Sequence, residues 1–67
     1  MDNTFYYTAG TPSREGETFK HNGSLRAAIE KAVDYGMETF ARDNNGNGPI
    51  VVVVDAYSGR RVYEERL

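Results

Sequence analysis

The sequence contains no cysteine and no tryptophan, and it has a single histidine. Without cysteine the fold has no disulfides, and one histidine without a thiol leaves no ordinary zinc site. No apolar run approaches the roughly 20 residues that a membrane-spanning helix needs. Residues 1–4 lack the basic segment and the apolar core of a signal peptide. We therefore expect a cytoplasmic protein with no membrane partner, no metal and no cofactor.

Catalytic pairings are also scarce. No nucleophile is paired in sequence with a base, and His21 lies beside an Asn-Gly turn, where we expect an exposed loop residue rather than a general base. Residues 43–48 match the first half of an EF-hand calcium loop, but Val54 stands where that loop needs a bidentate glutamate. No glycine-rich phosphate loop is present. The sequence predicts a protein that is not an enzyme.

The length of 67 residues predicts one domain, residues 1–67. So short a chain buries only about 60% of the surface that its unfolded form exposes, so burial against another molecule would add to its stability. The formal net charge of -2 argues against affinity for duplex nucleic acid, which comes chiefly from lysine and arginine on phosphates.

Residues 50–54, Ile-Val-Val-Val-Val, are the most informative stretch. Five consecutive β-branched residues after a glycine- and asparagine-rich break are typical of a strand that is apolar on both faces. Such a strand needs a cover on each side. Because the chain offers only one convincing amphipathic helix, we expect the second face to be open or closed by another molecule.

The remaining elements follow from local patterns. Strands are expected at residues 4–8, 18–21 and 61–67, with a mobile connection at 9–17. Ser24 is a good N-cap for a helix that runs to about Arg42. Within it Gly36 costs about 1 kcal/mol relative to alanine, so we expect the helix backbone to approach a strand closely there. The prediction is an α+β fold of order ββαββ, with one helix on one face of a four-stranded sheet.

The turn at residues 55–60 decides which side chains share a face, with Asp55 placed to cap the turn amides. A two- or four-residue turn puts Val51 and Val53 on the open face with Tyr6 and Val62. The helix would then cover the more apolar set, which is Ile50, Val52, Val54, Ala56, Tyr63 and Leu67. A three-residue turn with a bulge at Gly59 would instead invert the last strand relative to the valines.

Two surfaces are therefore candidates for contact with a partner. One is the open sheet face, and the other is an acidic ridge on the helix made by carboxylates four residues apart, which is ordinarily a solvated face. The predicted partner-binding residues are Tyr6, Val51, Val53, Val62, Arg60, Glu30, Asp34 and Glu38.

The segment 18–67 resembles some small phage inhibitors of the anti-CRISPR type. The likeness lies in a short strand, a helix that opens Ser24-Leu25-Arg26-Ala27-Ala28, and a valine-rich strand that leads into Asp55-Ala56-Tyr57-Ser58-Gly59-Arg60. The resemblance implies a phage protein that binds and blocks a host nucleoprotein complex in the host cytoplasm, and it transfers no functional residue.

The function that the sequence favours is a small protein-binding module, an inhibitor or adaptor whose partner is a host protein or nucleoprotein complex. A sheet that binds single-stranded nucleic acid through Tyr6, Arg60, Arg61 and Arg66 is an alternative, although the aromatic signature of RNA-binding sheets is missing. A structural homodimer closed by its own sheets is another.

Overall fold

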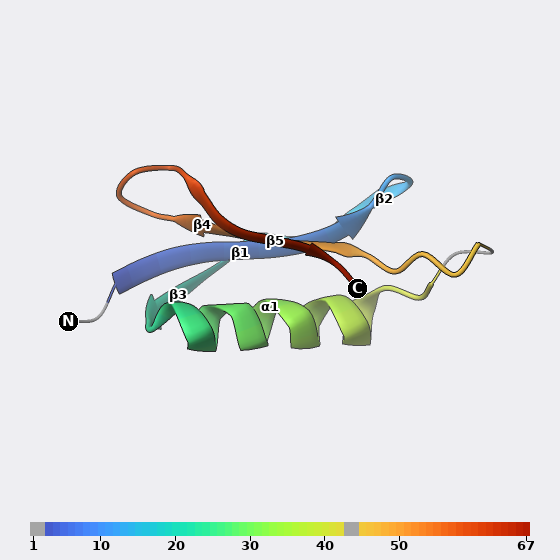
Figure 1. The fold of residues 1–67 in the computed structure, drawn as a ribbon, viewed down its shortest axis with the longest axis horizontal. Coiled ribbons are helices and arrows are strands. Elements are labelled where there is room, and N and C mark those ends of the chain that lie inside the picture. The colour runs from blue at the N-terminus through green and yellow to red at the C-terminus, as the bar shows by residue number, and fades with distance from the viewer. Residues whose placement is uncertain (1–2, 43–44) are drawn as a thin grey trace.

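A computed structural model describes residues 3–42 and 45–67 (Figure 1). Its elements, in chain order, are β1 (Asn3–Thr11), β2 (Arg14–Glu15), β3 (Phe19–Gly23), α1 (Leu25–Thr39), β4 (Ile50–Asp55) and β5 (Arg61–Arg66). The strands pair antiparallel in one sheet, with α1 along one face. The expected α+β domain with one helix and an antiparallel sheet is confirmed. The exact four-stranded ββαββ arrangement is not confirmed, because the sheet has five strands, with β2 as the additional one.

β1 is longer than expected, and the sheet is organised around it. One edge of β1 pairs with β4, while the other edge is shared by β3 and, further along, by β2. β2 forms because a turn at Pro12 and Ser13 reverses the chain, so that Thr11 pairs with Arg14. Proline favours such turns because its φ angle is already set. Residues 9–17, expected as a mobile connection, thus supply the end of β1 and an additional edge strand.

The helix begins where the sequence predicted. The Ser24 hydroxyl accepts a hydrogen bond from the Ala27 N–H (3.1 Å), as an N-cap does. The helix ends before Phe40, short of the expected end near Arg42. The Phe40 N–H still donates to the Gly36 carbonyl (3.0 Å), but the Phe40 side chain turns into the core. Burial of this aromatic ring outweighs the favourable helix propensity of Ala41 and Arg42, which follow it.

Small residues let the helix approach the sheet. Ala28, Ala32 and Gly36, one turn apart, are all buried on the helix face that meets the strands. A Cβ atom on Gly36 would lie 3.2 Å from a side-chain carbon of Leu67 and 3.3 Å from side-chain carbons of Ala9 and Val51. The close helix–strand contact that the sequence predicted at Gly36 is confirmed.

The valine strand presents the opposite face to the helix from the one predicted. Val51 and Val53 are fully buried, and they pair with Ala9 and Tyr7 of β1. The set Ile50, Val52 and Val54 is only half-buried and faces away from α1. The placement of Val51 and Val53 on the open face was therefore wrong, whereas Tyr6 does lie on that face.

A bulge in β5 explains the error. The Asp55 N–H donates to the Arg60 carbonyl (2.9 Å), which is the pairing of a four-residue turn. Val54 then pairs with Arg61, but Val53 pairs with Tyr63, so Val62 is an extra residue in β5. One extra residue inverts every side chain that follows. Tyr63 consequently shares the helix-facing side with Val53, and the bulge lies inside β5 rather than at Gly59.

Aromatic side chains close the β3 side of the core. The rings of Tyr7, Phe19, Tyr35 and Phe40 form a chain, with successive centroids 5.4, 4.8 and 6.0 Å apart. The Tyr35 hydroxyl accepts a hydrogen bond from the Glu17 N–H (2.8 Å). The Arg14 guanidinium lies 5.1 Å from the centre of the Phe40 ring, within the range of a cation–π contact. These contacts fix residues 14–19 against the helix.

Candidate protein-binding face

The sheet has a helix-covered inner face and an uncovered outer face. We define the outer face by its apolar centre, which consists of Tyr6, Ile50, Val52, Val54 and Val62. Tyr6 and Val62 are each 41% exposed, and the other three are half-buried. Since Val51 and Val53 on the inner face have no exposed surface, the two sides of the same sheet differ clearly in solvent contact. The outer face is therefore an apolar surface that the fold leaves without a cover.

The strand registers place four side chains in a row across the outer face. Tyr6 of β1 pairs with Lys20 of β3 on one side and with Val54 of β4 on the other. Val54 in turn pairs with Arg61 of β5. Directly paired residues in antiparallel strands point to the same side of the sheet. We call this row, Lys20–Tyr6–Val54–Arg61, the transverse row: an aromatic and an aliphatic side chain with a cation at each end.

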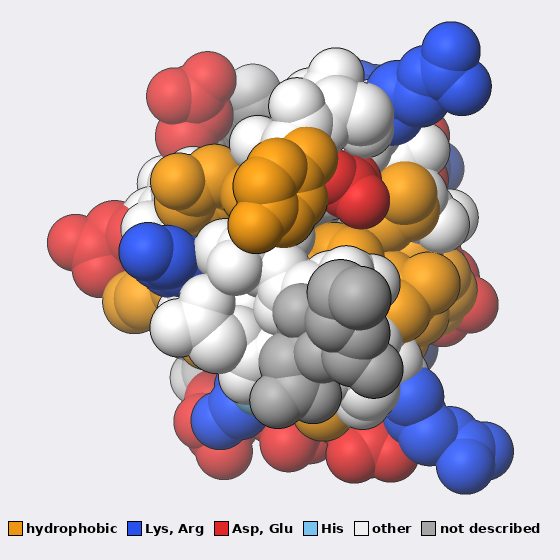
Figure 2. Space-filling view, turned by 90° about the vertical axis from the view of Figure 1, so that its left-hand side faces the viewer, with side chains coloured by type: hydrophobic (Ala, Val, Ile, Leu, Met, Phe, Trp, Pro, Cys, Tyr) orange, Lys and Arg blue, Asp and Glu red, His pale blue; other side chains and the backbone are white. Residues whose placement is uncertain are grey.

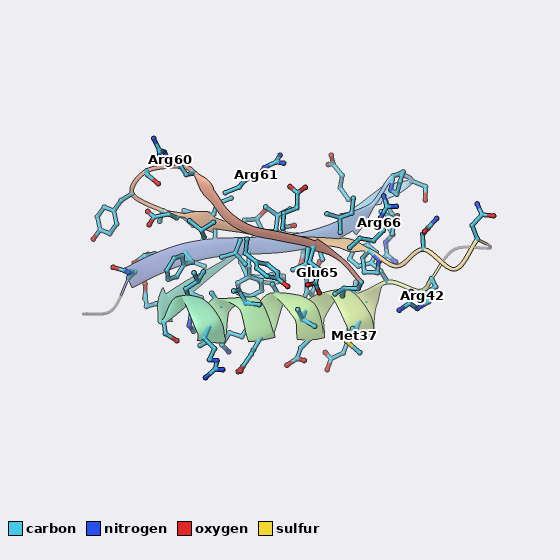
Figure 3. The ribbon with its side chains drawn as sticks, in the orientation of Figure 1. Met37, Arg42, Arg60, Arg61, Glu65 and Arg66 are labelled. Atoms are coloured by element: carbon cyan, nitrogen blue, oxygen red, sulfur yellow. The ribbon has the colours of Figure 1, made fainter. Side chains whose placement is uncertain are left out.

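The charged groups around the apolar centre are mostly basic. Arg66 pairs with Ile50, and Arg60 and Arg61 stand on the side of the sheet away from α1 (Figure 3). The acidic residues of this face are Glu64, opposite Val52, and Glu15, opposite Gly10. The Arg61 guanidinium lies 2.8 Å from the Glu64 carboxylate, an exposed pair worth at most about 1 kcal/mol. The outer face therefore has four cations, which are Lys20, Arg60, Arg61 and Arg66. Since it has only two carboxylates, Glu15 and Glu64, its net charge is positive.

The outer face is concave along the long axis of the molecule. Figure 1 shows that β2 at one end, and the turn between β4 and β5 at the other, both bend away from α1. A depression of about 380 Å³ lies beside β2, with Thr8, Gly10, Thr11 and Ile50 among its lining residues. The Thr8 and Thr11 hydroxyls donate to backbone carbonyls of residues 17 and 14. Glu15 and Thr18 also line the depression, so its lining is both polar and apolar.

The second predicted surface, the acidic ridge, lies on the far side of the molecule. Glu30, Asp34 and Glu38 are exposed on the side of α1 away from the sheet, and acidic side chains gather along the lower edge of Figure 2, where the helix runs. Within residues 3–42 and 45–67 the one ion pair is Arg61–Glu64, so the ridge has no basic partner there. The large apolar side chain on the same side of the helix is Met37, which is 68% exposed.

The structure brings together only part of the predicted site. Tyr6, Val62 and Arg60 lie on the outer face, as predicted, while Val51 and Val53 are in the core. Val52, Val54 and Lys20 belong to the outer face and were not predicted as binding residues, and Arg61 was predicted only for the nucleic-acid alternative. Lys20 could have been found from its place beside Tyr6 in a paired edge strand. The valines could not, because their orientation depends on the bulge.

His21 is not the exposed loop residue that the sequence suggested. It lies in β3 opposite Phe5, half-buried on the inner face. Its Nε2 atom is buried and has no hydrogen-bond partner among the described residues. No group of three or more His, Asp or Glu side chains in that part of the chain is arranged to hold a metal ion. Asp43, which begins the partial calcium-loop pattern, lies outside the described residues.

Comparison of the chain with protein-family models, with curated proteins and with solved structures gave no match. Over the described residues, the helix is neither long nor apolar enough to cross a membrane. The fold and the outer face define the chain as a small α+β domain with one uncovered, net positive sheet face.

Proposed function

We propose that this chain is a small, non-enzymatic protein-binding module that uses the outer face as its contact surface. The observation that carries the proposal is the contrast between the two faces of β4. Val51 and Val53 are sealed by α1, whereas Val52 and Val54 lie beside Tyr6 and remain partly open to solvent. Apolar surface rimmed by charge is typical of interaction sites, in which the centre is apolar and the rim polar.

The more specific form of the proposal is an inhibitor that acts in a host cytoplasm on a host protein or nucleoprotein complex. It is supported by the resemblance of residues 18–67 to small phage inhibitors, and by the small size of the domain. An inhibitor of this kind needs only to occupy a surface that its target uses, so an exposed face without catalytic groups is sufficient for it.

Single-stranded nucleic acid is the second candidate, because Tyr6 lies between two cations in the transverse row. A base can stack on an exposed tyrosine while lysine and arginine meet phosphates. This function predicts that affinity falls steeply with added salt. It is the weaker candidate, since Glu64 and Glu15 share the face and the other apolar side chains there are aliphatic.

The test of the protein-binding proposal compares variants of the same bait in a host lysate. Tyr6→Ser and Val54→Ser should each unfold cooperatively and should each reduce capture of the specific partner by about tenfold or more, as loss of a central apolar contact does. Leu25→Ser and Met37→Ser are the matched controls, since these exposed apolar residues lie on the helix. Equal capture by all four variants would refute the proposal.

A further inference from the structure

The geometry of the transverse row specifies the partner further, on the premise that the outer face is a protein-binding surface. Its four residues lie on four neighbouring strands, β3, β1, β4 and β5. Neighbouring strands are about 4.8 Å apart, so the backbones of Lys20 and Arg61 are separated by about 14 Å. Tyr6 and Val54 fill the space between them. The row therefore presents positive, apolar, apolar and positive groups in a line perpendicular to the strands.

The charges of the row select an acidic partner. Lys20 is exposed and has no ion pair among the described residues, and Arg61 has only its exposed contact with Glu64. Arg60 and Arg66 add to the positive potential on the same face. Complementary potentials steer association and suppress partners of the wrong charge. A basic segment would be repelled at both ends of the row.

Over the middle of the outer face, away from the unpaired edge of β5, the backbone of the sheet favours a helix over an extended segment. β1 and β4 are both paired on each of their edges, so the middle of the row offers no free backbone groups to an added strand. An extended peptide laid across the face would leave its own N–H and C=O groups without partners, which costs free energy when they are buried. A helix satisfies these groups internally.

We propose that the outer face binds an acidic amphipathic helix laid across the strands. Two turns of helix rise about 11 Å, and the flexible side chains of Lys20 and Arg61 can span the rest of the distance between their backbones. Two carboxylates spaced two turns apart would meet the two cations, and an apolar side chain midway would rest on Tyr6 and Val54. The acidic ridge of a second copy does not meet this requirement, because Asp34 stands midway between Glu30 and Glu38 where an apolar residue is needed.

The test is a titration of the isotope-labelled chain with a defined peptide, followed by two-dimensional NMR. The probe is an alanine-rich helical peptide with glutamates two turns apart and a leucine midway, and its control carries lysines in place of the glutamates. We expect shifts that cluster on the transverse row. Lys20→Glu and Arg61→Glu should each weaken binding by about tenfold or more, and added salt should weaken it further. Arg26→Glu, on the helix, is the matched control and should leave binding unchanged.

Four results would overturn this inference. The first is equal binding of the acidic and lysine peptides, and the second is no binding of either peptide. The third is tighter binding of an oligouridylate than of the acidic peptide. The fourth is concentration-dependent self-association in sedimentation that Glu38→Lys abolishes. Failure of this inference can be distinguished from failure of the proposed function. If Tyr6→Ser abolishes capture from the lysate while Lys20→Glu and Arg61→Glu leave it unchanged, the outer face binds a protein but not an acidic helix.

Discussion

His21 places an imidazole nitrogen in the interior without a hydrogen-bond partner among the described residues. A buried polar atom that lacks a partner costs about 1–3 kcal/mol relative to its hydration in the unfolded chain. The side chain lies opposite Phe5 on the inner face. The unpaired nitrogen of His21 therefore lowers the free energy of unfolding.

We expect His21→Phe to raise the free energy of unfolding by about 1 kcal/mol, because the ring stays while the unpaired nitrogen is removed. Urea unfolding followed by circular dichroism measures this change. His21→Gln keeps a polar group at the position and should give no gain. A less stable His21→Phe variant would show that the nitrogen has a stabilising contact.

Tyr63 and Glu65 are the second informative pair at this scale. The hydrogen bond from the Tyr63 hydroxyl to the Glu65 carboxylate raises the pKa of Tyr63 above its ordinary value of 10.0, with smaller contributions from burial and from the negative charge of Glu65. Folding thus favours protonated Tyr63. The corresponding stability is fully present below pH 10.0 and is lost as pH rises through the raised pKa.

Glu65→Gln should lower the pKa of Tyr63 towards 10.0, since a neutral amide is a weaker acceptor and carries no charge. The tyrosinate absorbance of the chain, with that of its Tyr63→Phe variant subtracted, isolates this titration. An unchanged Tyr63 titration in Glu65→Gln would mean that the carboxylate is not responsible for the raised pKa.

At the scale of elements, the β5 bulge determines the two faces of the sheet. Because Val62 is an extra residue, the inner face gains Tyr63 beside Val53, and the outer face receives Val54. Neighbouring valines of β4, although chemically identical, therefore differ in burial: Val53 is buried under the helix, and Val54 keeps contact with solvent.

Val53→Ala should lower the free energy of unfolding by about 2 kcal/mol, because it removes buried methyl groups and leaves a cavity under the helix. Val54→Ala, its matched control, should lower it by less than about 1 kcal/mol, since Val54 keeps solvent contact. Chemical denaturation of both variants measures the difference. A larger loss of stability for Val54→Ala than for Val53→Ala would contradict this register and support the one predicted from the sequence, in which Val54 faces the helix.

Local signals made part of the fold predictable. Ser24 marked the start of the helix, Gly36 marked the close helix–strand contact, and Asp55 was expected to cap its turn. Asp55 does so by accepting hydrogen bonds from the Tyr57 and Ser58 N–H groups at 2.8 and 3.1 Å. Each of these signals involves residues close in sequence or a single unusual residue type.

The rest depended on contacts between distant residues. The bulge allows Tyr63 and Leu67 to face the core together with Val51 and Val53. The two faces of the valine run have nearly the same composition, so the sequence does not indicate which of them the helix covers. β2 exists because β1 continues past residue 8 and offers an edge to Arg14 and Glu15. Three of the five residues of the apolar centre, Ile50, Val52 and Val54, depended on that long-range register and so were assigned to the wrong face.

On the scale of the whole molecule, charge and shape are divided between two sides. The chain has a net charge of -2, yet the outer face is net positive, so the remainder is more acidic than the total suggests. The molecule has two layers, the helix and the sheet. The acidic ridge lies on the exposed side of the helix, and the outer face lies on the exposed side of the sheet. The outer face therefore attracts the acidic groups of a partner, whereas the acidic ridge on the opposite side repels them.

The most direct test is a hydrogen-exchange and chemical-shift map of the labelled chain, alone and bound to the partner that it captures from a host lysate. We predict that protection and shift changes centre on Lys20, Tyr6, Val54 and Arg61, and that Glu30, Asp34 and Glu38 are unaffected. Changes centred on those three carboxylates, with the outer face unaltered, would contradict the account.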